Sequence, residues 1–230
     1  CRAKNLVLIA DEVYQENVWR DGAKFVSFKR VVAEMGAAKD IQLASLHSVS
    51  KGFFGECGRR GGFVELSGFS RDVRDLMYKM ASVALCSNVE GQLTVGIMCN
   101  PPKPGEASYD LFCKERDATL QSLKRRAAIV GKTLNYGTSL SCQQPEGALY
   151  AFPRIELPPK FVAKFAANPD EAYCLQLLED TGIVLVPGSG FGQREGSHHF
   201  RVTILPPEEE PAGVMGQIVE FHKRSVSKWE

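Results

Sequence analysis

Short apolar runs that stop at polar residues are the first pattern along the chain. Residues 5–10 are rich in branched side chains without polar alternation, which is typical of a strand buried on both faces in a parallel sheet, and they stop at Asp11. Residues 41–46 form a second such run, and residues 25–35 between them have the helical spacing of a crossover. Ligands bind where the carboxyl ends of parallel strands meet, so these two strand ends predict a site at one edge of an open α/β sheet.

The alternation of strands and helices continues through the first half of the chain. Residues 61–66 predict a third strand, and Ser70 is placed to cap the following helix. We interpret the apolar stripe of that helix as core packing; it consists of Val73, Leu76, Met77 and Met80. After a stiff proline-rich connector at residues 100–105, a long amphipathic helix is expected from Ser108 to about residue 134.

Beyond Ser139 the predicted elements are shorter. Strands are expected at residues 148–152, 183–186 and 200–205, and helices at residues 169–181 and about 212–228. Asn168 and Pro169 mark the start of the first of these helices, and Gly182 marks its end. The acidic run at residues 208–210, flanked by prolines, is expected to be a solvated loop.

Composition and charge narrow the class of protein. The 230 residues suffice for one large domain or two small ones, and we expect the long helix to link a domain at residues 1–120 to a second at residues 121–230. With 44% apolar and 24% charged residues, the chain is neither disordered nor collagen-like. The 28 basic and 27 acidic residues leave a net charge of +1 without a basic stripe, so no nucleic-acid partner is expected. The apolar runs are far shorter than the roughly 20 residues that cross a bilayer, which predicts a soluble protein without a membrane partner.

Cysteine and histidine usage argues against a disulfide framework and a metal site. The seven cysteines are an odd number without a C-x-x-C pair, and the four histidines lack metal-ligand spacing. We therefore expect free thiols in a reducing compartment, the cytoplasm or alternatively the mitochondrial matrix. Because a predicted strand follows Cys1 almost at once, we expect the chain to be a fragment that lacks an N-terminal part.

The most informative polar residues follow the first two predicted strands. Asp11 and Tyr14 follow the first strand, and Ser48-Val-Ser-Lys51 follows the second, with two arginines shortly after it. A lysine hemmed in by arginines has its ammonium form disfavoured and can act as a Schiff-base amine. Pyridoxal-phosphate enzymes need such a lysine and a partner for the pyridine nitrogen of the cofactor, and Asp11 provides that partner.

Phosphate and carboxylate groups also find suitable partners in the sequence. Ser48 and Ser50, with an arginine before a pair of glycines, offer hydroxyl, guanidinium and backbone donors to a phosphate. Arg201 follows the glycine-rich turn at residues 187–192. Its planar fork suits the carboxylate of an amino-acid substrate.

Each candidate residue also has an ordinary structural interpretation. Asp11 could cap the next helix, Lys51 could be a solvated loop residue, and Arg201 could form a surface ion pair. Ser48-x-x-Lys51 lacks the Ser-Asp-Asn and Lys-Thr-Gly partners of serine acyl-enzymes, and Gly131-Lys-Thr is an incomplete phosphate-binding loop. The candidates in their observed order are stronger evidence than any one of them alone.

The stretches around these residues resemble the fold-type I aminotransferases that depend on pyridoxal phosphate, and among them the alanine aminotransferases. The resemblance spans nearly all of the chain and rests on five motifs: Ala10-Asp-Glu-Val-Tyr-Gln15, His47-Ser-Val-Ser-Lys-Gly52, Gly55-Glu-Cys-Gly-Arg-Arg-Gly-Gly62, Val186-Pro-Gly-Ser-Gly-Phe-Gly-Gln193 and His199-Phe-Arg-Val-Thr-Ile-Leu-Pro206. The first two motifs are shared by many fold-type I enzymes. Gly-Glu-Cys-Gly and the Phe-Gly-Gln-Arg-Glu-Gly at residues 191–196 are specific to the alanine enzymes and their close relatives.

This resemblance implies which residues bind the cofactor, pyridoxal 5'-phosphate. Lys51 holds it covalently and moves the substrate proton, Asp11 pairs with the pyridinium nitrogen, and Tyr14 donates a hydrogen bond to the ring oxygen. Ser48 binds the phosphate.

The resemblance leaves two choices for the arginine that binds the phosphate. The common spacing of eight residues after the lysine favours Arg59, whereas the Arg-Gly-Gly sequence of the alanine enzymes favours Arg60. We choose Arg60. Arg201 is implied to bind the α-carboxylate of the substrate.

A fold, a reaction and an assembly also follow from the resemblance. The implied fold is α/β, with part of a large cofactor-binding domain around a mixed, mostly parallel sheet, followed by a smaller C-terminal α/β domain. The implied reaction converts L-alanine and 2-oxoglutarate to pyruvate and L-glutamate in a homodimer. The alternatives are another amino donor, elimination or decarboxylation in the same fold, or an inactive fragment that serves only for dimerisation or binding.

Overall fold

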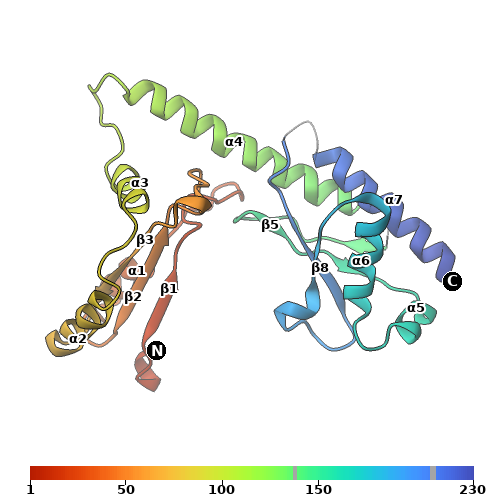
Figure 1. The fold of residues 1–230 in the computed structure, drawn as a ribbon, viewed down its shortest axis with the longest axis horizontal. Helices are drawn as coiled ribbons and strands as arrows, with labels where there is room; N and C mark the ends of the chain where they lie inside the picture. The colour runs from red at the N-terminus through yellow and green to blue at the C-terminus, as the bar shows by residue number, and fades with distance from the viewer. Residues whose placement is uncertain (137–138, 208–210) are drawn as a thin grey trace. The chain divides into compact units, whose positions relative to one another are not determined.

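The chain divides into two compact units, which we describe separately. The computed structural model describes residues 1–136, 139–207 and 211–230, so the acidic run at 208–210 lies outside the described residues. Unit 1 contains residues 1–18 and 22–118, and unit 2 contains residues 19–21 and 119–230. The change of unit falls within the predicted long helix, α4 (Tyr109–Leu134), which is confirmed (Figure 1).

A mixed three-stranded sheet in the order β1-β2-β3 forms the centre of unit 1 (Figure 1). β1 (Leu8–Asp11) pairs parallel with β2 (Leu43–Ser48), and β2 pairs antiparallel with β3 (Gly62–Ser67). Helix α1 (Phe28–Glu34), capped by Ser27, makes the crossover between the two parallel strands. The three predicted strands and the crossover helix are confirmed, and α/β is the fold class.

The core of unit 1 lies on one face of this sheet. It consists of Ala10, Val32, Ala37, Ile41 and Leu43. On the other face, Ile9 is 67% exposed, so the prediction that the first strand is buried on both faces is wrong for the described chain. The physical reason is that α1 packs against one face only. β1 also begins later than predicted, because a 3-10 turn, η1 (Arg2–Lys4), ends at Asn5 in a left-handed conformation with φ 51°.

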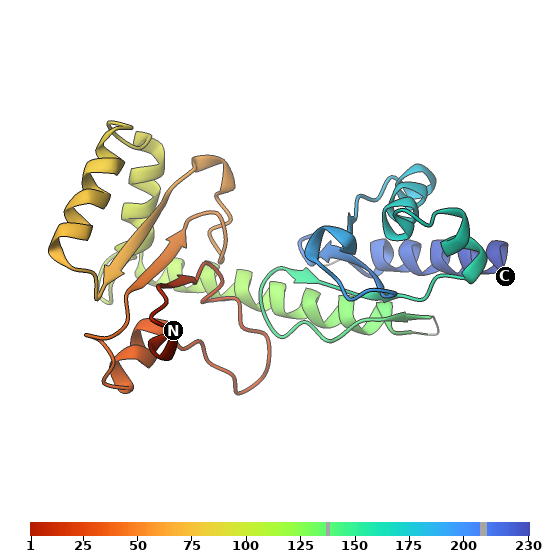
Figure 2. The ribbon, with the colours of Figure 1, turned by 90° about the horizontal axis from the view of Figure 1, so that it is seen from below.

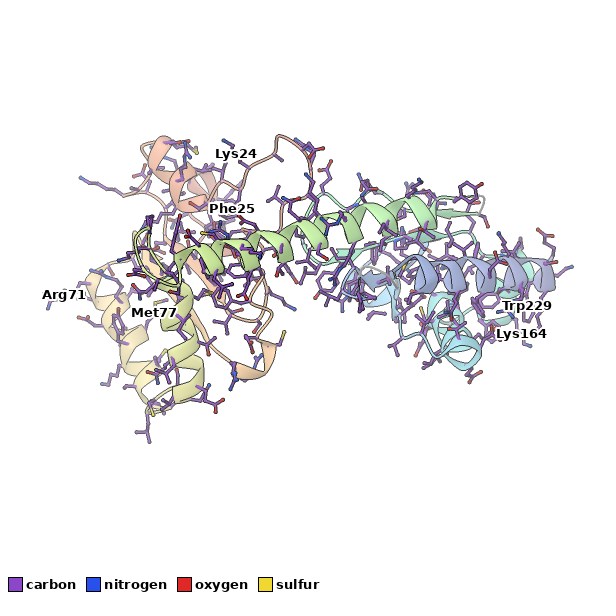
Figure 3. The ribbon with its side chains drawn as sticks, turned by 90° about the horizontal axis from the view of Figure 1, so that it is seen from above. Lys24, Phe25, Arg71, Met77, Lys164 and Trp229 are labelled. Carbon is purple, nitrogen blue, oxygen red and sulfur yellow. The ribbon has the colours of Figure 1, made fainter. Side chains whose placement is uncertain are left out.

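Helix α2 (Arg71–Ser82) begins where the sequence predicts. The hydroxyl of Ser70 accepts a hydrogen bond from the Val73 backbone N–H at 3.4 Å. Its apolar stripe is exposed, with 60% exposure at Leu76, 38% at Met77 and 76% at Met80 (Figure 3). The core-packing interpretation is therefore wrong for the described chain, because α2, described over its whole length, buries none of its residues.

Helix α3 (Val89–Cys99) was not predicted, although it packs beside β3 (Figure 2). It is apolar around most of its circumference and contains Gly91 and Gly96, so it lacks the amphipathic period that identifies a helix. Asn88 caps it by accepting a hydrogen bond from the Gly91 backbone N–H at 2.7 Å.

Unit 2 is built on an antiparallel sheet of short strands. Their order is β4 (Leu140–Ser141), β6 (Arg154–Ile155), β8 (His198–Thr203) and β5 (Tyr150–Ala151), and β7 (Val186–Pro187) also pairs with β8. Two of the three strands predicted for this half are present as β5 and β8, whereas β7 shares only Val186 with the predicted residues 183–186. β4 and β6 have only two residues each, too few to produce a hydrophobic period.

Three helices complete unit 2 together with the second half of α4. α6 (Pro169–Thr181) has the predicted bounds and ends at Gly182, whose left-handed φ of 74° closes the helix. α7 (Pro211–Trp229) is also confirmed, whereas α5 (Pro159–Lys164) was not predicted. The Lys164 ammonium lies 4.9 Å from the centre of the Trp229 ring, so α5 contacts the end of α7 (Figure 3). Fully buried side chains of the unit 2 core include Leu134, Ile155, Phe161, Tyr173, Leu177, Phe200, Ile204, Met215 and Ile218.

The described helices and cysteines add two observations. Within the described ranges, the structure contains no helix that combines the length and apolar character required to cross a membrane. All seven cysteines are described, and all are free thiols as expected. Burial raises the pKa of Cys142 to about 11 and that of Cys174 to about 12.

Candidate active site

The ends of β1 and β2 bring Asp11 and Ser48 to one edge and one face of the unit 1 sheet. In the register of this parallel pair, Asp11 lies opposite Leu46, two residues before Ser48. Side chains alternate along a strand, so Asp11, Leu46 and Ser48 share one face of the sheet. This face is opposite to the one that carries Ala10 and packs on α1. A carboxylate and a hydroxyl from distant segments therefore lie on the same side of the same sheet edge.

The loop that follows β2 gives Lys51 a defined place beside this edge. Val49 is fully buried, its N–H donates to the Gly61 carbonyl oxygen at 3.1 Å, and its own carbonyl oxygen accepts from the Glu56 N–H at 2.9 Å. Gly52 turns the chain directly after Lys51 with a left-handed φ of 69°. Lys51 is half-buried. One buried side chain and two backbone hydrogen bonds thus anchor the loop that carries the amine.

Tyr14 lies in the turn that follows β1, and Asn17 connects this turn to the lysine loop. The Tyr14 carbonyl oxygen accepts a hydrogen bond from the Asn17 N–H at 2.9 Å. The Asn17 side chain is buried and donates through Nδ2 to the Gly52 carbonyl oxygen at 3.3 Å. Sequence reasoning missed Asn17, because an isolated polar residue in a loop belongs to no periodic pattern.

Two glycines at the start of β3 allow close approach of backbone to backbone. A Cβ atom on Gly61 would lie 2.6 Å from the Gly91 carbonyl oxygen, and one on Gly62 would lie 2.9 Å from the His47 carbonyl oxygen. Both distances are shorter than real Cβ contacts, so any side chain here would displace backbone. The Arg-Arg-Gly-Gly segment is therefore constrained by packing between β2 and α3.

The two candidate arginines differ in their partners. Arg59 forms ion pairs with Glu90 at 2.8 Å and Glu56 at 3.7 Å, and the hydrogen bond from its guanidinium to Glu90 raises the pKa of Arg59. Arg60 has a left-handed φ of 52°, and its Nη1 donates to the Cys57 carbonyl oxygen at 3.0 Å. Among the described residues, Arg60 makes no ion pair. Because phosphate binding needs a guanidinium that no carboxylate neutralises, this difference favours Arg60 over Arg59.

A pocket of about 240 Å³ lies inside unit 1, with His47 in its lining. The His47 and Phe63 rings form a T-shaped pair with 5.9 Å between their centres, and burial lowers the pKa of His47. Glu16 and Arg116 also line the pocket; burial raises the pKa of Glu16 against the opposing effect of the Arg116 charge. His47 alternates with Ser48 along β2, so it points to the other face of the sheet. The pocket is therefore separate from the polar set on the Asp11 face.

Arg201 belongs to β8 of unit 2 and lies between two aromatic rings. Its guanidinium carbon is 4.6 Å from the centre of the Tyr150 ring and 5.0 Å from the centre of the Phe191 ring. Tyr150 is on the paired strand β5, and Phe191 ends the turn η3 (Gly188–Phe191) between β7 and β8. Such contacts use the face of a guanidinium and leave its N–H edge for a carboxylate. Sequence reasoning selected Arg201 but missed both rings.

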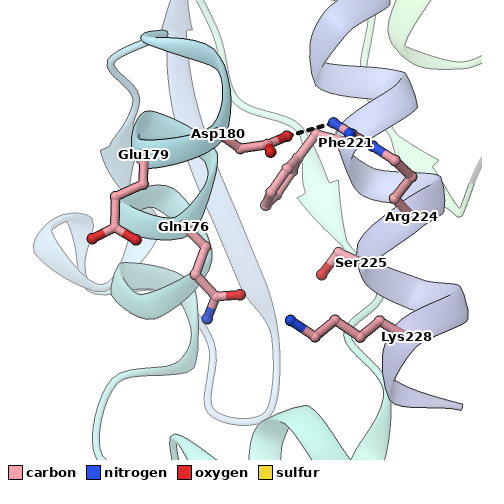
Figure 4. Close-up of a pocket in the computed structure, with 7 residues that line it drawn as sticks. All are labelled: Gln176, Glu179, Asp180, Phe221, Arg224, Ser225 and Lys228. Atoms are coloured by element: carbon pink, nitrogen blue, oxygen red, sulfur yellow. Dashed lines mark hydrogen bonds and ion pairs between the residues drawn. The ribbon is translucent and has the colours of Figure 1, made fainter.

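The groove between α6 and α7 has a different character (Figure 4). Asp180 and Arg224 form an ion pair across it, and Glu179 and Lys228 add one charge of each sign. Exposed charges that are paired in this way contribute little energy and offer no reactive group.

Two further observations concern competing kinds of site. Gly131-Lys-Thr lies inside α4, where the helix uses the backbone N–H groups that a phosphate-binding loop would need. In the part of the chain that the structure describes, no three His, Cys, Asp or Glu side chains gather as metal ligands.

Unit 1 carries an acid and a lysine at neighbouring strand ends, and unit 2 carries an arginine between two aromatic rings. These features agree with the family that the motifs suggest. The family model described as Aminotransferase class I and II matches residues 1–214. The match covers most of the chain, so the chain belongs to the class I and II aminotransferases.

Named relatives show which aminotransferases the chain is similar to. The chain is 52% identical over 235 residues to the probable mitochondrial alanine aminotransferase of Dictyostelium discoideum, covering 100% of this chain and 44% of that protein. It is 47% identical over 234 residues to glutamate–glyoxylate aminotransferase 2 of Arabidopsis thaliana, covering 100% of this chain and 49% of that protein. The fold is similar to that of an alanine aminotransferase from Pyrococcus furiosus, with a TM-score of 0.76, 26% identity, and coverage of 95% of this chain and 50% of that one.

These comparisons confirm the predicted resemblance to the aminotransferases and the predicted fold class. They also show that the chain spans about half the length of the relatives it matches. The roles of individual residues stay predictions, and so does the activity of the whole protein that contains this chain.

Proposed function

We propose that the whole protein transfers the amino group of L-alanine to 2-oxoglutarate, forming pyruvate and L-glutamate, with pyridoxal phosphate as cofactor. The observation that carries the proposal is the placement of Asp11, Ser48 and the Lys51 loop at the carboxyl ends of β1 and β2. Membership of the aminotransferase family and 52% identity to an alanine aminotransferase over the full chain support the reaction.

The residues at this sheet edge fit the cofactor in their chemistry. The cofactor has three groups to bind. Its aldehyde needs a primary amine, its pyridine nitrogen needs a carboxylate that keeps the nitrogen protonated, and its phosphate needs hydroxyl and guanidinium donors. All these groups occur around one edge of unit 1, and the guanidinium of Arg60 is not neutralised by any described carboxylate. In the proposed site Lys51, Asp11, Tyr14, Ser48 and Arg60 bind the cofactor.

Each residue then has a separate task in the reaction. Pyridoxal phosphate, when bound, supplies an electron sink for the bonds of the substrate α-carbon. Asp11 holds a proton on the pyridine nitrogen, which makes the ring more electron-withdrawing. The Nζ atom of Lys51, once the substrate amine displaces it, would move a proton between the substrate α-carbon and the C4′ atom of the cofactor. Arg201 binds the α-carboxylate and so orients the substrate.

The proposal also covers assembly and location. Unit 1 corresponds to part of the large cofactor-binding domain, expected at residues 1–120, and unit 2 to the smaller domain, expected at residues 121–230; the change of unit within α4 supports this division. We propose a homodimer as the active assembly. The compartment is the cytoplasm or the mitochondrial matrix, and the Dictyostelium relative is named a mitochondrial enzyme.

Spectroscopy on the whole protein tests the cofactor and the lysine together. The protein with pyridoxal phosphate is expected to show a visible absorption band that L-alanine bleaches. Borohydride reduction followed by peptide mapping is expected to find the label on Lys51. Lys51→Ala should lose the band and the activity, whereas Lys79→Ala, at an exposed lysine of α2, should keep both. A label on another lysine, or an active Lys51→Ala variant, would contradict the proposal.

A second candidate reaction uses glyoxylate as the amino acceptor. The 47% identity to glutamate–glyoxylate aminotransferase 2 favours testing it, because this identity is close to the 52% shared with an alanine aminotransferase. Values of kcat/KM for the two donor and acceptor pairs, measured on one preparation, separate the candidates. If kcat/KM is larger for glutamate with glyoxylate than for alanine with 2-oxoglutarate, the glyoxylate reaction becomes the favoured function.

A further inference from the structure

A buried carboxylate fixes the glycine-rich turn of unit 2. Asp170, in the first turn of α6, is 1% exposed. Its Oδ2 accepts hydrogen bonds from the Ser189 backbone N–H at 2.5 Å and from Gln193 Nε2 at 3.1 Å. A buried carboxylate is costly unless it is hydrogen-bonded, so these contacts are strongly favoured. Asp170 thereby attaches α6 to both ends of the turn that carries Phe191.

Gln193 extends this contact to β8. With its Nε2 donating to Asp170, its Oε1 lies 3.0 Å from His199 Nδ1, so His199 must donate through Nδ1. The His199 ring stacks on Phe152 with 4.9 Å between ring centres and 4° between the planes. The orientation of one amide therefore fixes the tautomer of His199 and supports the ring of Phe152.

The same set of contacts ends at Arg201. The Phe152 and Phe191 rings meet edge to face at 5.5 Å between centres, and the Phe191 ring is 5.0 Å from the Arg201 guanidinium carbon. Phe152 is 41% exposed and Phe191 is 47% exposed. The described residues therefore cover each ring only in part, and the polar contacts of Asp170 and Gln193 add a restraint on the turn that carries Phe191.

We propose that Asp170 and Gln193 are positioning residues for substrate binding, which hold Phe191 against Arg201 and so orient its guanidinium fork toward the α-carboxylate. This proposal rests on the proposed function of Arg201. Neither residue touches the substrate in this scheme; both act through the turn and its aromatic ring. Loosening the turn should therefore weaken carboxylate binding without removing the chemistry that Lys51 and Asp11 perform.

Steady-state kinetics and ligand binding on the whole protein with its cofactor test the proposal. The test variants are Asp170→Ala, which removes both hydrogen bonds, and Gln193→Met, which keeps the length of the side chain and removes its polar atoms. Each should raise KM for L-alanine about 3- to 10-fold, the size of a lost cation–π contact, with kcat changed less than about twofold. The inhibition constant of propionate, which has the carboxylate but no amine, should rise by the same factor.

Two control variants separate positioning from general stability. Asp170→Asn retains a carbonyl oxygen that can accept both hydrogen bonds, so it should restore much of the affinity for propionate. Asp180→Ala removes an acidic residue from the other end of α6, where Asp180 pairs with Arg224, and should leave KM and propionate binding unchanged. Gln193 is only half-buried, so Gln193→Met gives a result even if Asp170→Ala does not fold.

The outcomes distinguish this inference from the function on which it rests. If Arg201→Lys weakens propionate binding but Gln193→Met does not, the positioning role is wrong and the assignment of Arg201 stands. If neither variant changes propionate binding, the assignment of Arg201 fails and the positioning role fails with it. If Gln193→Met lowers the melting temperature but leaves KM and propionate binding unchanged, Gln193 is only structural and the inference is overturned.

Discussion

The guanidinium carbon of Arg201 lies 4.6 Å from the centre of the Tyr150 ring. The two residues are diagonal neighbours on paired strands, because Tyr150 is the register partner of Thr203, two residues beyond Arg201. Strand pairing therefore places an aromatic ring beside the cation, although the two residues are far apart in the sequence. The ring restricts the orientation of the guanidinium, and bidentate binding of a carboxylate requires a restricted orientation.

Replacing this fork by an ammonium should weaken substrate binding. Arg201→Lys keeps the charge but loses bidentate geometry, so KM for L-alanine should rise roughly 10- to 100-fold, as expected for about 1.5–3 kcal/mol of charge-assisted hydrogen bonding. Steady-state kinetics on the whole protein measure this change. Arg154→Lys on the neighbouring strand β6 is the matched control and should leave KM within about twofold. An unchanged KM in Arg201→Lys would remove Arg201 from the proposed site.

Asp11 and Glu12 are adjacent acids with different expected roles. Asp11→Asn should lower kcat by roughly 10²-fold or more, the scale associated with a positioned proton-holding group, while the cofactor stays attached. Glu12 Oε1 accepts a hydrogen bond from the Phe28 backbone N–H at 2.8 Å at the start of α1. Glu12→Gln should therefore affect only stability, by about 1 kcal/mol or less. Turnover and the cofactor spectrum are the measurements, and equal kcat values in the two variants would contradict the role of Asp11.

Gly188 and Gly190 lie in the same turn but differ in the space around them. A Cβ atom on Gly188 would lie 2.4 Å from Gln193 Oε1 and 2.8 Å from the His199 backbone oxygen, whereas one on Gly190 would meet nothing within 4 Å. Gly188→Ala should therefore cost about 1–3 kcal/mol through overpacking and disturb the contact with Gln193. Gly190→Ala should be tolerated. Melting temperatures of the two variants test this difference, and equal losses would show that the turn adapts.

His222 should make the stability of unit 2 depend on pH. Its Nε2 lies 2.7 Å from Ser139 Oγ, its Nδ1 lies 3.2 Å from the Tyr173 hydroxyl, and burial lowers the pKa of His222 to about 4. An unfolded histidine takes up a proton below about pH 6.5, whereas the folded one stays neutral down to about pH 4. Stability should therefore be lost as pH falls through this window, by up to about 1.4 kcal/mol per pH unit.

Thermal unfolding between about pH 7 and about pH 4.5 measures this effect. His222→Gln, which can still hydrogen-bond but does not titrate, should show a flatter dependence of melting temperature on pH. His198→Gln, at the partly exposed start of β8, controls for the loss of a histidine as such. Parallel curves for the wild type and His222→Gln would contradict the prediction.

The sequence by itself determined the helix ends and strands that depend only on residues close by in the chain. The branched run before Asp11 predicts β1, Ser70 predicts the start of α2, and Pro169 with Gly182 predicts both ends of α6. These signals work because helix caps, proline, glycine and strand-forming residues act on their own segment of backbone. The same signals indicated where a site would lie, since the polar residues follow directly after the predicted strands.

Tertiary structure decided which residues meet. The parallel register puts Asp11 and Ser48 on one face, and the pairing of β5 with β8 puts Tyr150 beside Arg201. In the sequence, Asp170 is an ordinary acidic residue in the first turn of a predicted helix. Only its burial against the turn before β8 indicates that it positions this turn. The period of hydrophobic residues shows that one face of a helix or strand is apolar, but it does not show what covers that face. Contacts between distant segments depend on strand register and on packing, and no local pattern encodes either of these.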